Sequence, residues 1–179
     1  MGVRMQPRSG RNEGDRDRGH TATPLYTPAE RTRRDTTVWT LVQGILAPVQ
    51  FVIFAVSLGL VVRYLMTGNG LAAATISVVI KTLALYTIMV TGAIWEKVVF
   101  GRYLFAPAFY WEDMFSMVVI ALHTAYVAAL LFDIGSDRSR LILALAAYAT
   151  YVINAGQFIL KLRAARLGAA AVDADMVPA

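Results

Sequence analysis

Four long apolar runs fill the middle of the chain, and short polar segments separate them. The runs cover residues 38–62, 71–94, 111–132 and 141–160. Each is close to the roughly 20 residues that a helix needs to cross the hydrocarbon core of a bilayer. A helix satisfies its own backbone hydrogen bonds in lipid, whereas an open strand does not. The pattern therefore predicts an all-α integral membrane protein, a four-helix transmembrane bundle within residues 36–166.

The two ends of the chain differ from this central part. Residues 1–35 are rich in arginine, glycine and acidic side chains without an apolar period, which is typical of a disordered basic N-terminal tail. Residues 167–179 are predicted to be a flexible C-terminal tail. Because acidic residues alternate with the arginines of the first segment, we expect no nucleic-acid partner.

Composition supports a membrane protein and removes some kinds of chemistry. Hydrophobic residues make up 57% of the chain and the mean hydropathy is +0.53, far above the values of a soluble domain. The chain contains no cysteine. Disulfides, thiolate metal sites and cysteine nucleophiles are therefore excluded.

Lysine and arginine are unevenly distributed beside the apolar runs. One side carries Arg31, Arg33, Arg34, Lys97, Arg102, Lys161, Arg163 and Arg166, and the other side carries Arg63, Arg138 and Arg140. The positive-inside rule then predicts a multi-pass protein with both termini and the loop at 96–110 in the cytoplasm. The short turns at 63–70 and 133–140 predict antiparallel packing of neighbouring helices.

The cytoplasmic loop is rich in aromatic residues. It contains Phe100, Tyr103, Phe105, Phe109 and Tyr110, with Trp95 and Trp111 at its edges. Two interpretations stay open, an interfacial aromatic belt and the mouth of an aromatic-lined pocket.

Polar side chains also recur inside the apolar runs. They include Gln43, Gln50, Lys81, His123, Asn154 and Gln157. At about 100° per residue, Glu112, Ser116, His123 and Tyr126 share one stripe of the third run, and Thr150, Asn154, Gln157 and Lys161 share one stripe of the fourth. For the amides and hydroxyls, hydrogen bonds between helices are the preferred interpretation. Ionisable groups at membrane depth are candidate functional residues.

Lys81 and His123 are both predicted to lie near the midplane, where they could share one cavity. The carboxylates Glu96, Glu112 and Asp113 lie at the cytoplasmic ends of the second and third runs. They either form part of a site or simply favour a helix start and balance nearby cations. Because most polar groups lie in the cytoplasmic half, the site is expected to open toward the cytoplasm.

This distribution disfavours two kinds of membrane protein. A transporter needs access from both sides, and the outer half of this chain is poor in polar residues. A haem-b carrier with two histidine ligands is also disfavoured, because His123 is the only histidine within the apolar runs.

Several longer stretches resemble the 3-vinyl bacteriochlorophyllide hydratase family, also called 2-vinyl bacteriochlorophyllide hydratase or chlorophyllide a 3(1)-hydratase. They are LYTPAER at 25–31, VQGILAPVQF at 42–51, the run at 81–117 that contains WEKVVFGRYLFAPAFYWEDM, ALHTAYVAALL at 121–131 and AAYATYVINAGQFILKLRAARL at 146–167. The resemblance covers about residues 25–167. It implies a hydro-lyase of bacteriochlorophyll a biosynthesis in the inner (cytoplasmic or intracytoplasmic) membrane of phototrophic bacteria.

The resemblance also implies the reaction, its substrate and its partners. Water adds to the 3-vinyl group of chlorophyllide a or a related chlorin, and the product carries a 3-(1-hydroxyethyl) group. The implied partners are the chlorin, the lipid bilayer and other enzymes of bacteriochlorophyll biosynthesis. No cofactor is expected, because magnesium is part of the chlorin substrate and hydration needs no redox group.

Chemistry and spacing then suggest roles for the candidate residues. Hydration requires a proton for the terminal carbon of the vinyl group and a positioned water for the inner carbon. Glu112 is the first choice for the proton donor, and Asp113 and Glu96 are substitutes. His123 is expected to accept a proton from water or to bind the magnesium of the substrate, and no metal site is expected in the protein itself. The candidate substrate-binding residues are Lys81, Asn154, Gln157, Tyr126, Lys97 and Arg102, with Lys161 as a further candidate for the propionate.

A non-enzymatic alternative is a membrane chlorin-binding or pigment-assembly protein. His123 would then bind the magnesium and the carboxylates would be dispensable.

Overall fold

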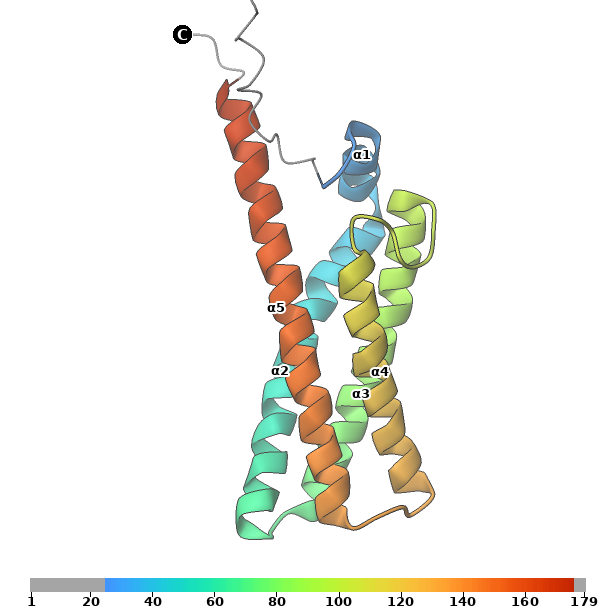
Figure 1. The fold of residues 1–179 in the computed structure, drawn as a ribbon, viewed down its shortest axis with the longest axis vertical. Coiled ribbons are helices and arrows are strands. Elements are labelled where there is room, and N and C mark those ends of the chain that lie inside the picture. The colour runs from blue at the N-terminus through green and yellow to red at the C-terminus, as the bar shows by residue number, and fades with distance from the viewer. Residues whose placement is uncertain (1–24, 176–179) are drawn as a thin grey trace, which may run out of the picture.

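The protein is a bundle of long helices with one short helix at its N-terminal side (Figure 1). The computed structural model describes the backbone of residues 25–175 and the side chains of residues 25–167. The elements in chain order are α1 (Pro28–Thr36), α2 (Val38–Thr67), α3 (Leu71–Phe100), α4 (Tyr110–Leu131) and α5 (Asp137–Asp175). No strand occurs in the described part of the chain.

Four of these helices are long and apolar enough to cross a membrane, namely α2, α3, α4 and the part of α5 from Asp137 to Leu167. Large apolar side chains are exposed on the outside of the bundle, among them Val52, Ile76, Leu83 and Ile153. An exposed apolar surface of this extent is unusual for a soluble monomer and normal for helices that face lipid. The predicted all-α bundle with four apolar spans is therefore confirmed.

The helices are longer than the apolar runs that predicted them. Two of them end where a glycine adopts a left-handed backbone, Gly68 with φ 72° after α2 and Gly101 with φ 83° after α3. Such glycines end a helix because the conformation carries no Cβ penalty there. Hydropathy thus located the segments that suit lipid, whereas the glycine caps determine where the helices end.

The prediction of a disordered tail over residues 1–35 is wrong for α1. Thr27 and Glu30 form a capping box, in which the Thr27 backbone N–H donates to Glu30 Oε2 at 2.8 Å and Pro28 starts the helix. These hydrogen bonds from Thr27 hold the pKa of the Glu30 carboxyl below its ordinary value. Residues 1–24 lie outside the described part.

The predicted flexible tail over residues 167–179 is also partly wrong, because the backbone of α5 stays helical to Asp175. The remaining residues of that tail lie outside the described part.

The bundle consists of two helical hairpins. Helix α2 packs mainly against α3, and α4 packs mainly against α5, with smaller contacts between α2 and α5 and between α3 and α4. Figure 1 shows α1, the 101–109 connection and the C-terminal part of α5 at one end, and both short turns at the other. The predicted antiparallel packing is therefore present.

The hairpins meet around one buried cluster. Its members are Phe54, Val61, Ala74, Val78, Tyr126, Leu141, Ala144 and Tyr148. Beside it, Ser57 Oγ lies 2.7 Å from Ser77 Oγ and 2.6 Å from the Tyr148 hydroxyl. These hydrogen bonds connect α2 to both α3 and α5, the role expected for hydroxyls in a membrane bundle.

We predict that Ala144→Leu destabilises the fold by about 1–3 kcal/mol, because the fully buried Ala144 has no room for three more carbons. Thermal unfolding of the detergent-solubilised protein measures the effect. Ala146→Leu is the matched control, since Ala146 is exposed on the same helix. Equal unfolding temperatures for the two variants would contradict the packing described here.

Candidate functional site

Lys81 and His123 lie together in the interior of the bundle. Neither side chain has any exposed surface. The His123 ring lies 5.8 Å from the Tyr148 ring, and Lys81 Nζ lies 5.9 Å from the same ring and 4.0 Å from the centre of the Tyr151 ring. The structure thus places both predicted midplane residues next to the Tyr148 ring.

Both residues keep a nitrogen without a hydrogen-bond partner. The Val119 carbonyl lies 2.8 Å from His123 Nδ1 and can only accept, so Nδ1 carries the hydrogen. In the neutral imidazole this leaves a lone pair on Nε2. Within residues 25–167, His123 Nε2 and Lys81 Nζ have no partner. Since buried polar atoms are nearly always paired, these two are the atoms of the interior best placed to meet a ligand.

The predicted amides form part of the same seam between helices. Asn154 Nδ2 donates to Ser116 Oγ at 2.8 Å, and Gln43 Nε2 donates to Thr91 Oγ1 at 2.8 Å, so both residues connect neighbouring helices. The side-chain oxygens of Asn154, Gln157 and Gln50 are buried and have no partner among the described residues. Tyr126 is 1% exposed and belongs to the buried cluster where the hairpins meet.

A second group of polar residues lies where α3 and α4 meet the 101–109 connection. Glu96 and Asp113 are 5% and 3% exposed, and their carboxyl groups are close enough to hydrogen-bond to each other. The Phe105 N–H donates to Asp113 Oδ2 at 2.7 Å, and the Ala106 N–H donates to Glu96 Oε2 at 3.2 Å. Two successive amides thus hold carboxyls that come from different helices.

Phe105 makes this arrangement possible through an uncommon backbone. Its φ is 58°, in the left-handed region that side chains other than glycine rarely adopt. Such a residue turns neighbouring N–H groups toward one concave point, which is a common way to bind acidic groups. Sequence reasoning did not identify this residue, because no glycine marks the position.

Glu112 has a different partner. Lys161 Nζ lies 2.7 Å from Glu112 Oε2, and the same ammonium lies 5.0 Å from the centre of the Phe109 ring. The predicted stripes of α4 and α5 therefore meet in an ion pair. This pair lies at the same end of the bundle as Glu96 and Asp113, since Glu112 is next to Asp113 in α4.

The two other predicted propionate-binding residues lie at the surface. Lys97 Nζ donates to the Gly101 carbonyl at 2.9 Å and lies 5.3 Å from the Tyr103 ring, so it caps the end of α3. Arg102 is exposed on the connection. Neither side chain contacts the buried groups.

The aromatic residues of the loop divide into two sets. Trp95, Phe100 and Phe109 pack against one another with ring centres 5.7–5.9 Å apart, and Tyr26 and Phe158 extend this cluster. Tyr103, Tyr110 and Trp111 are exposed. The inner rings thus fill space instead of lining an open mouth, and the outer rings match an interfacial belt.

The segment before α2 holds this end of the bundle together. Tyr26 stacks on Phe100, and Arg33 Nε donates to the Val99 carbonyl at 2.9 Å near the end of α3. Burial raises the pKa of the Tyr26 hydroxyl, which keeps it neutral. The sequence pattern predicts a tail over residues 1–35 and therefore misses this contribution.

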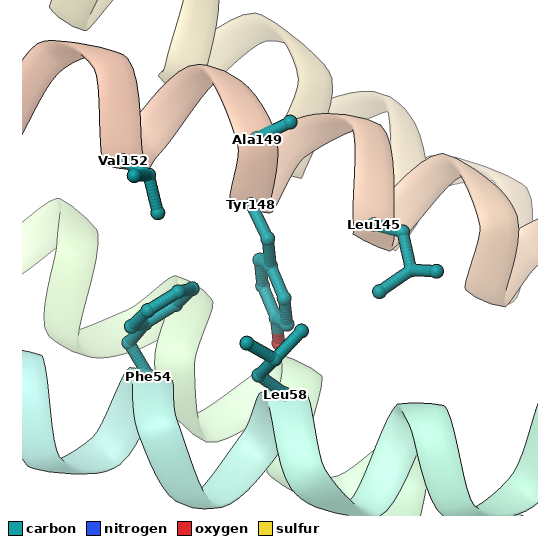
Figure 2. A pocket seen from close by; sticks show the side chains of 6 residues that line it. All are labelled: Phe54, Leu58, Leu145, Tyr148, Ala149 and Val152. Atoms are coloured by element: carbon teal, nitrogen blue, oxygen red, sulfur yellow. The ribbon is translucent and has the colours of Figure 1, made fainter.

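An apolar groove lies on the outside between α2 and α5 (Figure 2). It has a volume of about 210 Å³ and is lined by Phe54, Leu58, Leu145, Tyr148, Ala149 and Val152. Figure 2 shows the Tyr148 ring reaching from α5 toward α2, with Phe54 on one side and Leu145 on the other. Tyr148 therefore separates the groove from Lys81 and His123.

The candidate residues thus form two groups along the bundle. Asp113 and His123 are ten residues apart on α4, which is about 15 Å along a helix. No set of three or more histidine and acidic side chains in the described residues is arranged to hold a metal ion. Together the features define a polytopic helical membrane protein with a buried polar seam and an acidic cluster at one end.

Comparison with known proteins identifies the family. A family profile described as 2-vinyl bacteriochlorophyllide hydratase (BCHF) matches residues 26–164. The 2-vinyl bacteriochlorophyllide hydratase of Rhodobacter capsulatus is 71% identical over 84% of this chain and 87% of its own length. That of Cereibacter sphaeroides is 71% identical over 80% of this chain and 89% of its own length. No solved structure matches the chain. The chain belongs to the 2-vinyl bacteriochlorophyllide hydratase family, which confirms the resemblance found in the sequence.

We predict that Lys161→Met lowers the stability of the protein by about 1–3 kcal/mol, because the buried Glu112 carboxyl loses the cation with which it pairs at 2.7 Å. The double variant Glu112→Gln, Lys161→Met should recover part of the loss, since no charge then stays unpaired. Thermal unfolding of wild type, the two single variants and the double variant measures the coupling. Strictly additive effects of the two substitutions would contradict the ion pair.

Proposed function

We propose that this protein is a hydro-lyase that adds water to the 3-vinyl group of chlorophyllide a or a closely related bacteriochlorophyllide. The observation that carries the proposal is 71% identity to two proteins named 2-vinyl bacteriochlorophyllide hydratase over at least 80% of this chain. The product has a 3-(1-hydroxyethyl) group. The apolar outer surface of the bundle suits a flat, apolar substrate that dissolves in the bilayer.

The proton donor in this proposal is the Glu96–Asp113 pair. A hydrogen bond between two carboxyl groups contains one proton, so such a pair can give up that proton as an acid. Glu112 was the first choice from sequence, but its carboxylate already has Lys161 as a partner at 2.7 Å. We therefore place Glu96 and Asp113 ahead of Glu112.

The reaction then has two steps. The carboxyl pair transfers its proton to the terminal carbon of the vinyl group, which leaves a cation at the inner carbon that the ring stabilises. A water molecule attacks the inner carbon and returns one proton to the carboxyl pair, so that the sum of the steps is the addition of one water. No electrons are transferred, and the proposed reaction uses no redox cofactor. Magnesium takes part only as a component of the chlorin substrate.

Other residues of the seam are proposed to hold the substrate and water. The unpaired side-chain oxygens of Asn154 and Gln157 are positioned to accept hydrogen bonds from water. His123 Nε2 can accept a proton or bind the chlorin magnesium. Because it lies about 15 Å along α4 from Asp113, it cannot bind the metal centrally and act at the same vinyl group as the carboxyl pair.

We further propose that the protein is located in the bacterial inner membrane with both termini in the cytoplasm. Figure 1 shows α1 and the 101–109 connection at the same end of the bundle. Helix α1 carries three arginines, Lys97 is in the last turn of α3, Arg102 is in the connection, and Lys161 pairs with Glu112 in the first turn of α4, which supports this orientation. Water and protons of the cytoplasm then reach the acidic cluster. Enzymes that make the vinyl chlorin or oxidise the hydroxyethyl product are its proposed partners.

A chlorin-binding protein without activity is the alternative, and the unpaired Nε2 of His123 is the observation that favours it. In that case substitution of the acidic residues would leave chlorin binding unchanged.

We predict that membranes of a pigment-free bacterium that produces this protein convert chlorophyllide a to a product heavier by one water. Mass spectrometry and the blue shift of the red absorption band follow the reaction. Membranes from cells with an empty vector are the control. Folded protein that binds the pigment and leaves it unchanged would favour the pigment-binding alternative.

We also predict that Glu96→Gln and Asp113→Asn each lower turnover about a hundredfold or more, the usual contribution of a general acid. Glu112→Gln is the matched control, because it removes a neighbouring carboxylate outside the proposed pair, and its effect should be below about tenfold. Turnover per folded protein in the chlorophyllide assay is the measurement. The reverse order of effects would return Glu112 to the role of proton donor.

A further inference from the structure

Lys81 is a buried cation without an anion. Its side chain is 0% exposed, and Nζ has no hydrogen-bond partner among residues 25–167. No ion pair in that part of the chain includes Lys81. The nearest acidic residue on its own helix is Glu96, fifteen residues away and therefore about 22 Å along α3.

The surroundings of Lys81 stabilise its charge only in part. The Tyr151 ring lies 4.0 Å below Nζ and provides a cation–π contact. The ring face contacts one side of the ammonium and provides no oxygen or nitrogen acceptor, whereas the ammonium has three hydrogens to donate. A buried ammonium requires an anionic partner with good geometry, and the described part of the chain does not supply one.

We propose that the missing partner is a carboxylate on the ligand, and that Lys81 binds the propionate of the chlorin. The inference rests on the proposed function, since it assigns the acidic arm of that substrate. Of the cations first considered for this role, Lys161 is paired with Glu112 at 2.7 Å and Lys97 caps the Gly101 carbonyl at 2.9 Å. Lys81 is the buried one whose donors have no partner.

This assignment also fits the length of the seam. The carboxyl pair is about 15 Å along α4 from the level of His123 and about 22 Å along α3 from Lys81, measured on the backbone. A tetrapyrrole with its propionate arm, together with the long lysine side chain, can bridge such a span. With the propionate at Lys81, the vinyl edge of the macrocycle points toward the Glu96–Asp113 pair. The reacting end of the substrate then lies near water, and the acidic arm lies at the buried cation.

The groove between α2 and α5 gives this ligand a route from the lipid. Its lining is mainly apolar and includes the Tyr148 ring (Figure 2). The same ring lies 5.9 Å from Lys81 Nζ and 5.8 Å from the His123 ring. A volume of about 210 Å³ admits part of a macrocycle, since pockets for whole cofactors are larger. Breaking the hydrogen bond between Tyr148 and Ser57 lets the ring move and joins the groove to the seam.

The test compares two ligands that differ only in the carboxylate. Detergent-solubilised protein is titrated with the hydrated chlorin, 3-(1-hydroxyethyl) chlorophyllide a, and with its propionate methyl ester, and binding is followed by the fluorescence of the pigment. Wild type should bind the free acid at least tenfold more tightly than the ester. Lys81→Met, which keeps the length of the side chain and removes the charge, should bind both forms equally. Arg102→Met, at an exposed cation, should keep the preference of wild type.

Equal binding of acid and ester by wild type would overturn the assignment and needs no variant. Loss of the preference in Arg102→Met and its retention in Lys81→Met would also overturn it and place the propionate at the exposed rim. The hydrated ligand undergoes no hydration, so this result is independent of turnover. If membranes fail to hydrate chlorophyllide a while the acid preference still depends on Lys81, the proposed reaction fails and the carboxylate site stands.

Discussion

The need to satisfy polar groups inside a lipid environment shapes this bundle. The outer faces of α2 to α5 are apolar, so polar side chains gather on the inward faces and find partners across helices. Ser57 joins Ser77 and Tyr148, Asn154 joins Ser116, and Lys161 joins Glu112. Where this pairing fails, at Lys81 and His123, the molecule contains its strongest candidates for ligand contact.

The buried carboxyl groups of the acidic cluster also need hydrogen-bond partners, and backbone N–H groups supply them. Glu96 and Asp113 receive the amides of Ala106 and Phe105, and the rings around Phe109 cover the other side of this connection. An uncommon left-handed residue, Phe105, stands at the centre of this arrangement. Local strain at such a position persists only where surrounding contacts fix it. Here the Phe105 ring packs 5.8 Å from the Tyr110 ring, and the Phe105 N–H donates to Asp113 Oδ2.

Much of this architecture could be predicted from residues alone. Apolar runs located the four long helices, and the 3.6-residue period placed Glu112, Ser116, His123 and Tyr126 on one buried face of α4, as observed. The period could not show which groups pair across helices, because that depends on the relative rotation of neighbouring helices. From the sequence, Glu112 is therefore a better candidate for the proton donor than Glu96 or Asp113, because the period does not show that Lys161 pairs with Glu112.

Other features of the structure could not be predicted from the helical period of the sequence. Thr27 and Glu30 have the spacing of a capping box, which is typical of a helix start. The many charged residues around them nevertheless favour the prediction of a disordered segment. Phe105 gave no signal, since no glycine marks its left-handed backbone in the sequence. The α2–α5 groove arises from the looser packing between the two hairpins, a property of the assembled bundle and not of any single helix.

The two carboxyl groups of the acidic cluster come from different hairpins. Glu96 belongs to the α2–α3 hairpin and Asp113 to the α4–α5 hairpin, and the 101–109 connection is the only covalent link between the halves. If the halves part far enough at that end to separate these carboxyls, the shared proton loses one of its two holders. The carboxyl pair is therefore complete only while the two hairpins are packed together at this end of the bundle, so the packing of the hairpins decides whether one proton can be shared between them.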